Sequence, residues 1–317
     1  MSRKGPVRFG RGLWETSENS STLSGLAAIR PLRCHVERRA WRLVSILTPH
    51  CESGDTSERR ERTELGYRRF RCRTCLREFN ERTGTRFNHL QYPTDVVCRV
   101  VLWRVRYKLS LRDLAEMFVE RGFVFTHETV RNWEATFAPL LTQHLRKHRY
   151  GHGSRRWHVD ETLIRVNGKW AYLYRALDHE GSLLDVRLSE TCDLAAARAF
   201  FRSARMITKR SPLRVTSDCH GSYPGALRLE FGPTITHRTT RYANNLLEQR
   251  HRAVKQRTRP MLGFKQFDSA ARFCQAHDEV RHFLRFQPIG HRPAPLAWQR
   301  RIQHHKFTLL REMMLAA

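Results

Sequence analysis

The sequence predicts an α/β protein whose mixed sheet lies in the second half of the chain. Three strand-like runs joined by tight turns begin at Trp157, and strand-like and helical runs alternate after them. A helical pattern over residues 93–148 precedes the sheet. The 317 residues, of which 40% are hydrophobic, suffice for about two domains with cores of their own.

Five short strands make up the expected sheet. Residues 157–166 and 169–177 form a hairpin around Asn167-Gly168, a dipeptide that favours a two-residue turn. Three antiparallel strands followed by alternating strands and helices describe a ribonuclease H-like layered fold. The other strands are expected at 183–188, 213–217 and 234–237, and the helices at 193–206, 222–229, 243–257 and 267–286.

A helix-turn-helix is expected before the sheet. Ser110 and Asp113 have the spacing of a capping box, Gly122 ends that helix, and Thr126 caps the next one. An ordinary helical hairpin is the alternative, but the pattern agrees with the basic composition. The second helix would present four side chains to a DNA groove: His127, Glu128, Arg131 and Asn132.

A zinc-ribbon-like segment is expected between residues 48 and 90. Tetrahedral zinc in a ribbon takes ligands from two C-x-x-C turns. The downstream turn is complete, whereas the upstream turn begins with Thr48 where a cysteine is needed. A degenerate ribbon that packs without metal is the alternative. The candidate ligands are Cys51, Cys72 and Cys75, with His50 or Cys34 as the fourth.

The charge balance points to a polyanionic partner. The formal net charge is +28, with +13 on residues 1–150 and +15 on residues 151–317. No run of 18 apolar residues exists, and the first 25 residues lack an apolar segment, so neither a membrane span nor a signal peptide is expected. These features indicate a cytoplasmic, nucleic-acid-binding protein with reduced cysteines.

Three carboxylates stand out in the basic second half. Asp160 lies inside the first strand, Asp218 directly follows the fourth, and Glu248 lies in a helix of basic and amide residues. A carboxylate in a buried strand is costly unless it is paired or binds metal. In the expected fold the three converge, and their oxygen ligands suit Mg²⁺ or Mn²⁺ for two-metal phosphoryl transfer.

The helix that carries Glu248 also carries cations at helical spacing. His251, Arg252 and Lys255 follow the glutamate by three, four and seven residues, and Asn244 precedes it by four. Cations one and two turns from a metal-binding carboxylate can hold DNA phosphates near the metals. Arg252 and Lys255 are therefore predicted DNA contacts.

Three segments resemble the DDE transposases of prokaryotic insertion sequences, in particular the family called insertion-sequence six. They read WHVDETLIRVNGKWAYLYRALDHEG, TSDCHGSYPGAL and ANNLLEQRHRAVKQRTRPMLGFKQFDSA. The resemblance covers residues 48–290. It places Asp160, Asp218 and Glu248 at the triad positions and Lys255 at the basic position seven residues later.

The resemblance implies an enzyme that binds the terminal inverted repeats of an insertion sequence and cuts and joins DNA strands with Mg²⁺. It also implies double-stranded DNA ends and target DNA as partners, and a homodimer or larger complex. Only 29 residues separate Asp218 from Glu248, fewer than the family pattern suggests. A catalytically inactive relic or repressor with the same fold is therefore the alternative.

These expectations divide the chain into five parts. A basic, poorly structured region over 1–47 has no assigned role and is followed by the zinc-ribbon-like segment, 48–90. The remaining parts are the helix-turn-helix domain, 91–150, the ribonuclease H-like catalytic domain, 151–262, and a C-terminal helical extension, 263–317.

Overall fold

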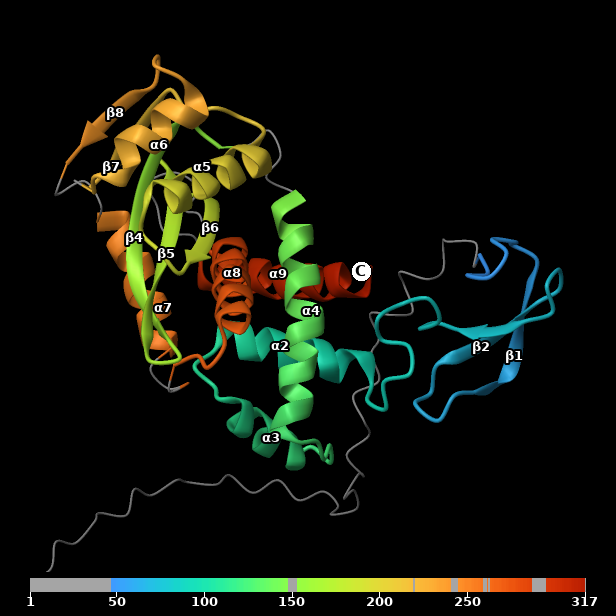
Figure 1. Cartoon of the computed structure of the whole chain (residues 1–317). Helices are drawn as coiled ribbons and strands as arrows, with labels where there is room; N and C mark the ends of the chain where they lie inside the picture. The colour runs from blue at the N-terminus through green and yellow to red at the C-terminus, as the bar shows by residue number, and fades with distance from the viewer. Residues whose placement is uncertain are drawn as a thin grey trace, which may run out of the picture. The chain divides into compact units, whose positions relative to one another are not determined.

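The structure is a computed structural model (Figure 1). It describes residues 47–147, 153–218, 220–240, 245–258, 261, 263–286 and 295–316, and the side chains of 245–250 are not among them. The expected N-terminal region therefore lies outside the described residues, apart from Leu47. Among the helices described, none has the length and apolar character needed to cross a membrane.

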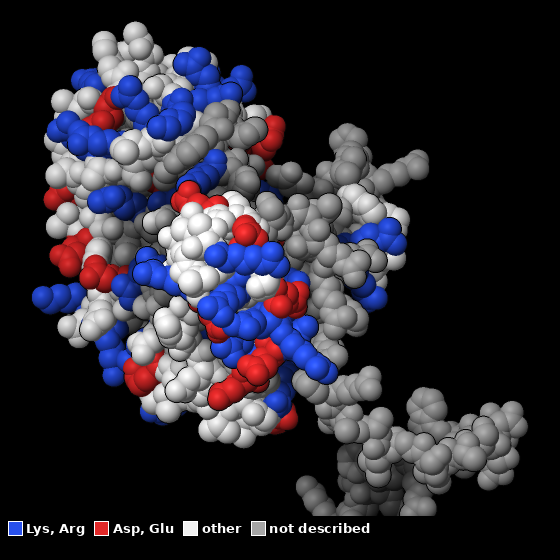
Figure 2. Space-filling view, turned by 90° about the vertical axis from the view of Figure 1, so that its right-hand side faces the viewer, with Lys and Arg blue, Asp and Glu red and all other residues white. Residues whose placement is uncertain are grey.

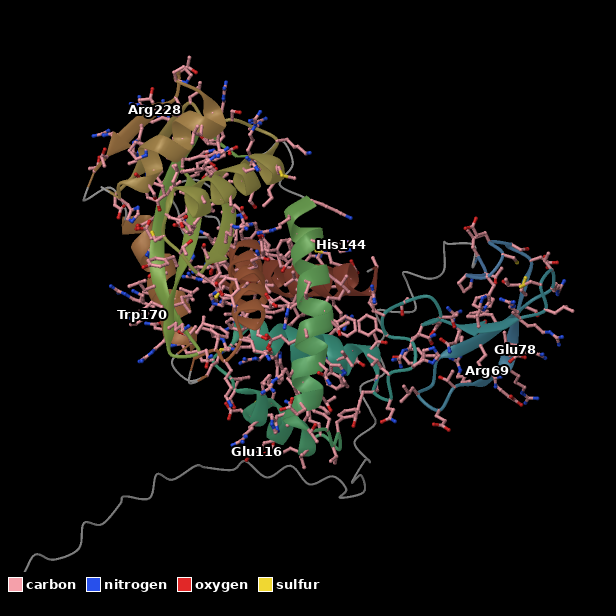
Figure 3. All side chains as sticks on the ribbon, viewed as in Figure 1. Arg69, Glu78, Glu116, His144, Trp170 and Arg228 are labelled. Carbon is pink, nitrogen blue, oxygen red and sulfur yellow. The ribbon has the colours of Figure 1, made fainter. Side chains whose placement is uncertain are left out.

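A small antiparallel sheet forms the first described part of the chain. It contains β1 (Thr56–Arg62), β2 (Arg68–Cys72) and β3 (Glu78–Asn80) in the order β1-β2-β3. Its apolar side is short, with Phe70 stacked on Phe79 at 5.4 Å between ring centroids. Its other side is charged, and Arg69 and Glu78 lie side by side in Figure 3, with Nη2 and Oε2 2.6 Å apart.

Three helices follow and confirm the predicted caps. They are α2 (Thr94–Arg106), α3 (Leu111–Val119) and α4 (His127–Lys147). Ser110 and Asp113 form a complete capping box at the start of α3. The Thr129 amide donates to Thr126 Oγ1 at the start of α4. Gly122 has a φ of 76°, a backbone conformation that favours glycine and turns the chain between the two helices.

Two C-terminal helices complete the core of this helical part. In Figure 1, α8 (Phe267–Leu284) and α9 (Leu296–Leu315) lie beside α4 and α2. Val280 of α8 and Met314 of α9 are fully buried in one apolar cluster with Trp133 and Phe137 of α4. Arg146, near the end of α4, adds ion pairs to Asp185 at 2.7 Å and to Glu279 at 3.2 Å.

The main sheet has five strands, as predicted. They are β4 (Arg156–Val166), β5 (Lys169–Asp178), β6 (Leu183–Ser189), β7 (Arg214–Ser217) and β8 (Thr236–Thr239). The order is β6-β5-β4-β7-β8. The first three strands pair antiparallel, whereas β7 pairs parallel with both β4 and β8. This mixed topology confirms the expected ribonuclease H-like arrangement.

The first hairpin closes at the predicted turn. Asn167 and Gly168 have φ values of 47° and 77°, so both adopt the left-handed conformation that a type I′ turn requires. Trp170, labelled in Figure 3, stands 57% exposed at this end of the hairpin. The Arg165 guanidinium lies 5.9 Å from the centre of its ring.

Alternation along β4 sends side chains to two helical layers. Trp157 and Val159 pack with α5 (Leu194–Thr208) and α6 (Ser222–Phe231). Ile164 and Val166 face the opposite layer, which contains Val254 of α7 (Asn245–Thr258) and part of α8. The sheet is thus covered on both faces, and β4 carries polar groups toward each layer.

Candidate active site

Asp160 lies in the middle of β4 and is almost buried, with 8% of its surface exposed. Its cross-strand partner is Arg175 of β5, which is completely buried and donates from Nε to Asp278 Oδ2 at 2.5 Å. A guanidinium charge therefore lies next to the strand position that carries the carboxylate. The Glu161 amide also donates to Asp160 Oδ1 at 3.0 Å.

Asp218 comes beside Asp160 because β4 and β7 run parallel. Thr216 pairs with His158, and two residues further along the same register lead from Asp160 to Asp218. Asp218 is half-buried, and its Oδ1 accepts from the His220 amide at 3.3 Å. The predicted proximity of these two carboxylates is confirmed.

A third carboxylate, Glu161, joins this pair. Each of Asp160, Glu161 and Asp218 offers an oxygen, and these oxygens lie within 4.8 Å of one another. Burial raises the pKa of the Glu161 carboxyl, and the neighbouring Asp218 charge adds to this rise. The Tyr223 hydroxyl donates to Glu161 Oε2. We call these three residues the carboxylate cluster.

Sequence reasoning missed Glu161. Neighbouring residues in a strand point to opposite faces, so strand periodicity does not predict that Asp160 and Glu161 share one cluster. The available signal was a second acidic residue directly after the first within the same strand. Its hydrogen bond with Tyr223 of α6 links two residues that lie far apart in the sequence. Local sequence patterns do not predict such a contact.

Glu248 lies in the first half of α7, but its side chain is outside the described part of the structure, as is Asn244 entirely. One turn later in the same helix, His251 is 4% exposed and its Nδ1 lies 4.0 Å from Asp160 Oδ2. Burial, together with the charges of Arg175 and Lys255, lowers the pKa of His251 to about 3. Helix α7 therefore contacts the strand that carries Asp160 through a neutral imidazole.

The other predicted cations of α7 are open to solvent. Arg252 and Lys255 are both exposed, whereas His251 and Val254 are buried against the sheet. The helix thus has one side packed on β4 and another that carries exposed positive charge. This separation agrees with the predicted roles of Arg252 and Lys255 as DNA contacts.

The carboxylate cluster fits a divalent cation by the chemistry of its donors. Three carboxylate oxygens within 4.8 Å repel one another when all are ionised, and a hard cation relieves that repulsion. Mg²⁺ and Mn²⁺ prefer such oxygen ligands and commonly use only one or two carboxylates from the protein. Asp160 and Asp218 are the predicted ligands in this group.

The predicted groove-facing residues lie at the start of α4. Arg131 and Asn132 are exposed and His127 is partly exposed. Glu128, which lies between them, contacts two of the other three: its carboxylate oxygens are 3.1 Å from His127 Nε2 and 3.0 Å from Arg131 Nη1. Neither of these two contacts involves Asn132.

Three of the four proposed zinc ligands come together. The sulfur atoms of Cys51, Cys72 and Cys75 lie within 4.8 Å of one another, and His50 is not part of this group. The Cys75 amide donates to Cys72 Sγ at 3.4 Å, and this bond is the main cause that lowers the pKa of Cys72 to about 7. Cys34 lies outside the described residues.

Charged side chains on the face shown in Figure 2 are mixed in sign, with acidic groups interspersed among Lys and Arg. In the small sheet, Arg59, Arg68 and Arg69 form ion pairs with glutamates. These charges are largely balanced locally. The net positive charge of the chain therefore does not mean that each face is positively charged.

Comparison with known proteins identifies the second half of the chain. A family model described as a DDE domain matches residues 154–287. A transposase for the insertion sequence-like element IS431mec of Staphylococcus aureus strain Mu50 is 38% identical over 177 residues, which are 54% of this chain and 77% of that relative. The transposase of IS257 in transposon Tn4003 of the same species is 37% identical over the same lengths.

Solved structures with some likeness are retroviral integrase cores. The catalytic core domain of BIV integrase is 18% identical, with a TM-score of 0.32 over 49% of this chain and 99% of that chain. The core domain of HTLV-2 integrase in complex with magnesium is 16% identical, with a TM-score of 0.28 over 33% of this chain and 68% of that chain.

The match to the DDE domain and the identity to the two transposases point to the same family. The match to the DDE domain contains Asp160, Asp218 and Glu248, and so contains all three positions expected to carry the chemistry. The chain belongs to the family of DDE transposases of insertion sequences, the polynucleotidyl transferases that include those of IS431mec and IS257.

Proposed function

We propose that this protein binds the terminal inverted repeats of an insertion sequence and catalyses metal-dependent cleavage and transfer of the DNA strands at those ends. The observation that carries the proposal is the carboxylate cluster at the centre of the main sheet. Family membership supports the class of reaction.

Asp160, Asp218 and Glu248 would hold the divalent ions. The chemistry supplied by two bound Mg²⁺ ions is activation of the attacking oxygen and stabilisation of the leaving 3′-oxygen in an in-line displacement. The backbone of α7 places Glu248 one turn before His251, which contacts Asp160. That contact supports convergence of α7 on the cluster in spite of the short Asp218–Glu248 interval.

The protein side chains would otherwise bind and orient DNA. Arg252 and Lys255 are exposed on α7, and Lys255 would hold a phosphate near the reacting end. Arg131 and Asn132 on α4 would contact the inverted repeat through a groove. Cutting and joining at two ends would bring together at least two copies of the chain.

A structural zinc ion is proposed for the small sheet. The cluster of Cys51, Cys72 and Cys75 supports it because three nearby thiolates are a common part of closed zinc sites. A fourth ligand would come from His50 or another donor. The ion would fix the loops around β1 and β2, where the apolar core is small, and would have no part in strand transfer.

Strand transfer with labelled inverted-repeat DNA tests the proposed activity. The wild type should join the labelled end to target DNA in Mg²⁺, and Asp218→Asn should lose at least about a thousandfold in rate, consistent with removal of a metal-binding carboxylate. Asp268→Asn, an exposed acidic residue of α8, is the matched control and should retain activity.

The same assay separates the enzyme from the alternative of an inactive relic or repressor. If the chain is a relic, the wild type itself would bind the inverted repeat but would transfer no strand in Mg²⁺ or Mn²⁺. Activity that survives Asp218→Asn would overturn the proposed metal centre instead. The two failures are distinguishable because the first is seen in the wild type and the second only in the variant.

A further inference from the structure

A second group of metal-binding side chains adjoins the carboxylate cluster. Glu161, Cys192 and His220 each offer one ligand atom, and these atoms lie within 4.8 Å of one another. They come from three elements: β4, the turn before α5 and the turn before α6. All three are partly buried, so the group is packed into the fold but still accessible to solvent.

Neighbouring side chains orient this group. His220 Nδ1 and Ser222 Oγ are 2.8 Å apart, and His220 Nε2 is 3.3 Å from Cys192 Sγ. One imidazole nitrogen is therefore held by a hydroxyl while the other faces the thiol. In metal-binding histidines, a hydrogen bond at the second nitrogen fixes the orientation of the ring.

Two tyrosines hold the other members. Tyr174 Oη donates to Cys192 Sγ at 3.3 Å, and the Tyr223 hydroxyl donates to Glu161 Oε2. Both tyrosines are completely buried in the layer between the sheet and α5 and α6. Rigid aromatic side chains thus restrict the thiol and the carboxylate that meet at this position.

We propose that Glu161, Cys192 and His220 form a binding site for a zinc-class transition metal ion, distinct from the oxygen-only site for Mg²⁺. A thiolate, an imidazole and a carboxylate are a donor set that Zn²⁺ accepts and Mg²⁺ disfavours. Water completes the coordination. Binding replaces the thiol proton of Cys192, which passes to solvent, so affinity falls as the pH falls.

The proposed zinc-class site adjoins the carboxylate cluster through Glu161. This residue belongs both to the carboxylate cluster and to the proposed zinc-class site. A zinc ion bound by Cys192 and His220 would also bind the Glu161 carboxylate. Its positive charge would then lie next to Asp218. Zn²⁺ is therefore expected to inhibit the Mg²⁺-dependent reaction. This consequence for activity rests on the proposed function, whereas the binding site itself does not.

Cobalt binding to the full chain tests the site directly. Co²⁺ gives a near-ultraviolet charge-transfer band when a thiolate ligates it, and a background with Cys51, Cys72 and Cys75 changed to Ser removes the other thiolate cluster. We expect one of the Co²⁺ ions bound by that background to give a thiolate band, and Cys192→Ala within it to lose the band. Cys98→Ala, a buried cysteine of α2, is the control and should keep it.

Several outcomes would overturn the site. They are a background protein with native circular dichroism but no thiolate band, or a band that persists after Cys192→Ala. If the triple substitution unfolds the chain, the comparison uses the native cysteines. Cys192→Ala should then lower the bound Co²⁺ by one equivalent, and an unchanged stoichiometry contradicts the proposal. Ser222→Ala should weaken binding about tenfold if it orients His220.

The activity assay then tests the regulatory consequence. At fixed Mg²⁺, added Zn²⁺ should inhibit strand transfer by the wild type at lower concentration than it inhibits His220→Ala. Equal inhibition of both proteins would show that zinc acts elsewhere, and would overturn the regulatory role. If neither protein transfers strands, the proposed function has failed, and the cobalt measurement still decides the metal site.

Discussion

His251 Nδ1 lies 4.0 Å from Asp160 Oδ2, and this contact connects helix α7 to the strand at the centre of the carboxylate cluster. Two further groups hold the same helix. Val254 is buried in the apolar layer beneath the sheet, and the Arg257 guanidinium donates to the Leu109 carbonyl at 3.2 Å. Helix α7 is thus fixed at several points after Glu248, although the preceding connection from Asp218 is short.

The first prediction is that His251→Ala weakens metal binding by displacing α7. Loss of the imidazole leaves a cavity between α7 and β4, and a supporting residue of a metal site typically contributes 10–100-fold in affinity, so strand transfer should fall by about tenfold or more. His251→Gln, which retains bulk and polarity, should fall less. The measurement is the Mg²⁺ dependence of strand transfer.

Iron-mediated cleavage of the protein gives a second readout for the same variant. Fe²⁺ bound in place of Mg²⁺ cuts the chain near its ligands when peroxide and ascorbate are added. Wild-type cuts should fall near Asp160, Asp218 and Glu248, and His251→Ala should lose those near Glu248. Cuts that remain unchanged in the variant would show that His251 does not position α7.

The second prediction concerns pH and the buried pair of Arg175 and Asp278. Burial of Asp278 opposes its ionisation, but the Arg175 and His277 charges outweigh this and hold the pKa of Asp278 well below its usual range. A depressed carboxyl pKa gives stability that is present above pH ~4, the unfolded value, and is lost as the pH falls below it. Unfolding in denaturant at several pH values measures this dependence.

A variant isolates that effect. Asp278→Asn leaves the Arg175 charge buried without its partner, and should cost about 3–5 kcal/mol at pH 7. The difference from wild type should shrink as the pH falls below ~4, because the Asp278 carboxyl of the unfolded wild-type chain then binds a proton that the folded state, with its depressed pKa, does not yet bind. The exposed Asp268→Asn serves as control. A difference that does not change with pH would contradict the assignment.

The third prediction is that metal removal loosens the small N-terminal sheet. The pKa of Cys72 is lowered to about 7, so a thiolate is available near neutral pH, and zinc affinity should decline as the pH falls through that value. A strong chelator should increase amide hydrogen exchange in β1, β2 and β3. Cys51→Ser should have the same effect without chelator, whereas Cys274→Ser should not.

Metal content decides this case independently of exchange. Native mass spectrometry should find zinc in the wild type and one ion fewer in Cys51→Ser. Exchange rates that are the same with and without chelator, in a chain that carries no zinc, would support the alternative of a ribbon that packs without metal.

Local sequence patterns predicted the hairpin turn, the helix cap and the proximity of two carboxylates. The hairpin at Asn167-Gly168, the capping box of Ser110 and Asp113, and the proximity of Asp160 and Asp218 all depend on short-range stereochemistry or on a regular register. Such signals are strong because each constrains a few adjacent residues or repeats at a fixed period.

Long-range packing could not be predicted in the same way. Arg175 reads as one charged residue in an apolar strand, and its partner Asp278 is 103 positions further along the chain. The place of α9 in the helical core and the addition of Glu161 to the carboxylate cluster likewise depend on tertiary contacts. Glu248 stays a prediction, because only its position in α7 is described.

The fourth prediction concerns Glu128 and the DNA-binding surface of α4. Its carboxylate contacts both His127 and Arg131, and so restrains two of the predicted DNA contacts. Glu128→Gln should raise affinity for any DNA, because it removes a negative charge near phosphates and releases Arg131. Arg131→Ala should lower affinity for all sequences and reduce the salt slope by about one.

Asn132 distinguishes sequence recognition from general attraction. It is exposed on α4 and is not held by Glu128, so it is free to contact a base edge. Asn132→Ala should relax the preference for the inverted repeat by about 1–3 kcal/mol while leaving the salt slope unchanged, because the amide carries no charge. Binding titrations with repeat and scrambled DNA at several salt concentrations measure both quantities. If Asn132→Ala weakened binding to both sequences equally, α4 would contact the DNA backbone alone, and the preference for the repeat would have to arise from another part of the chain.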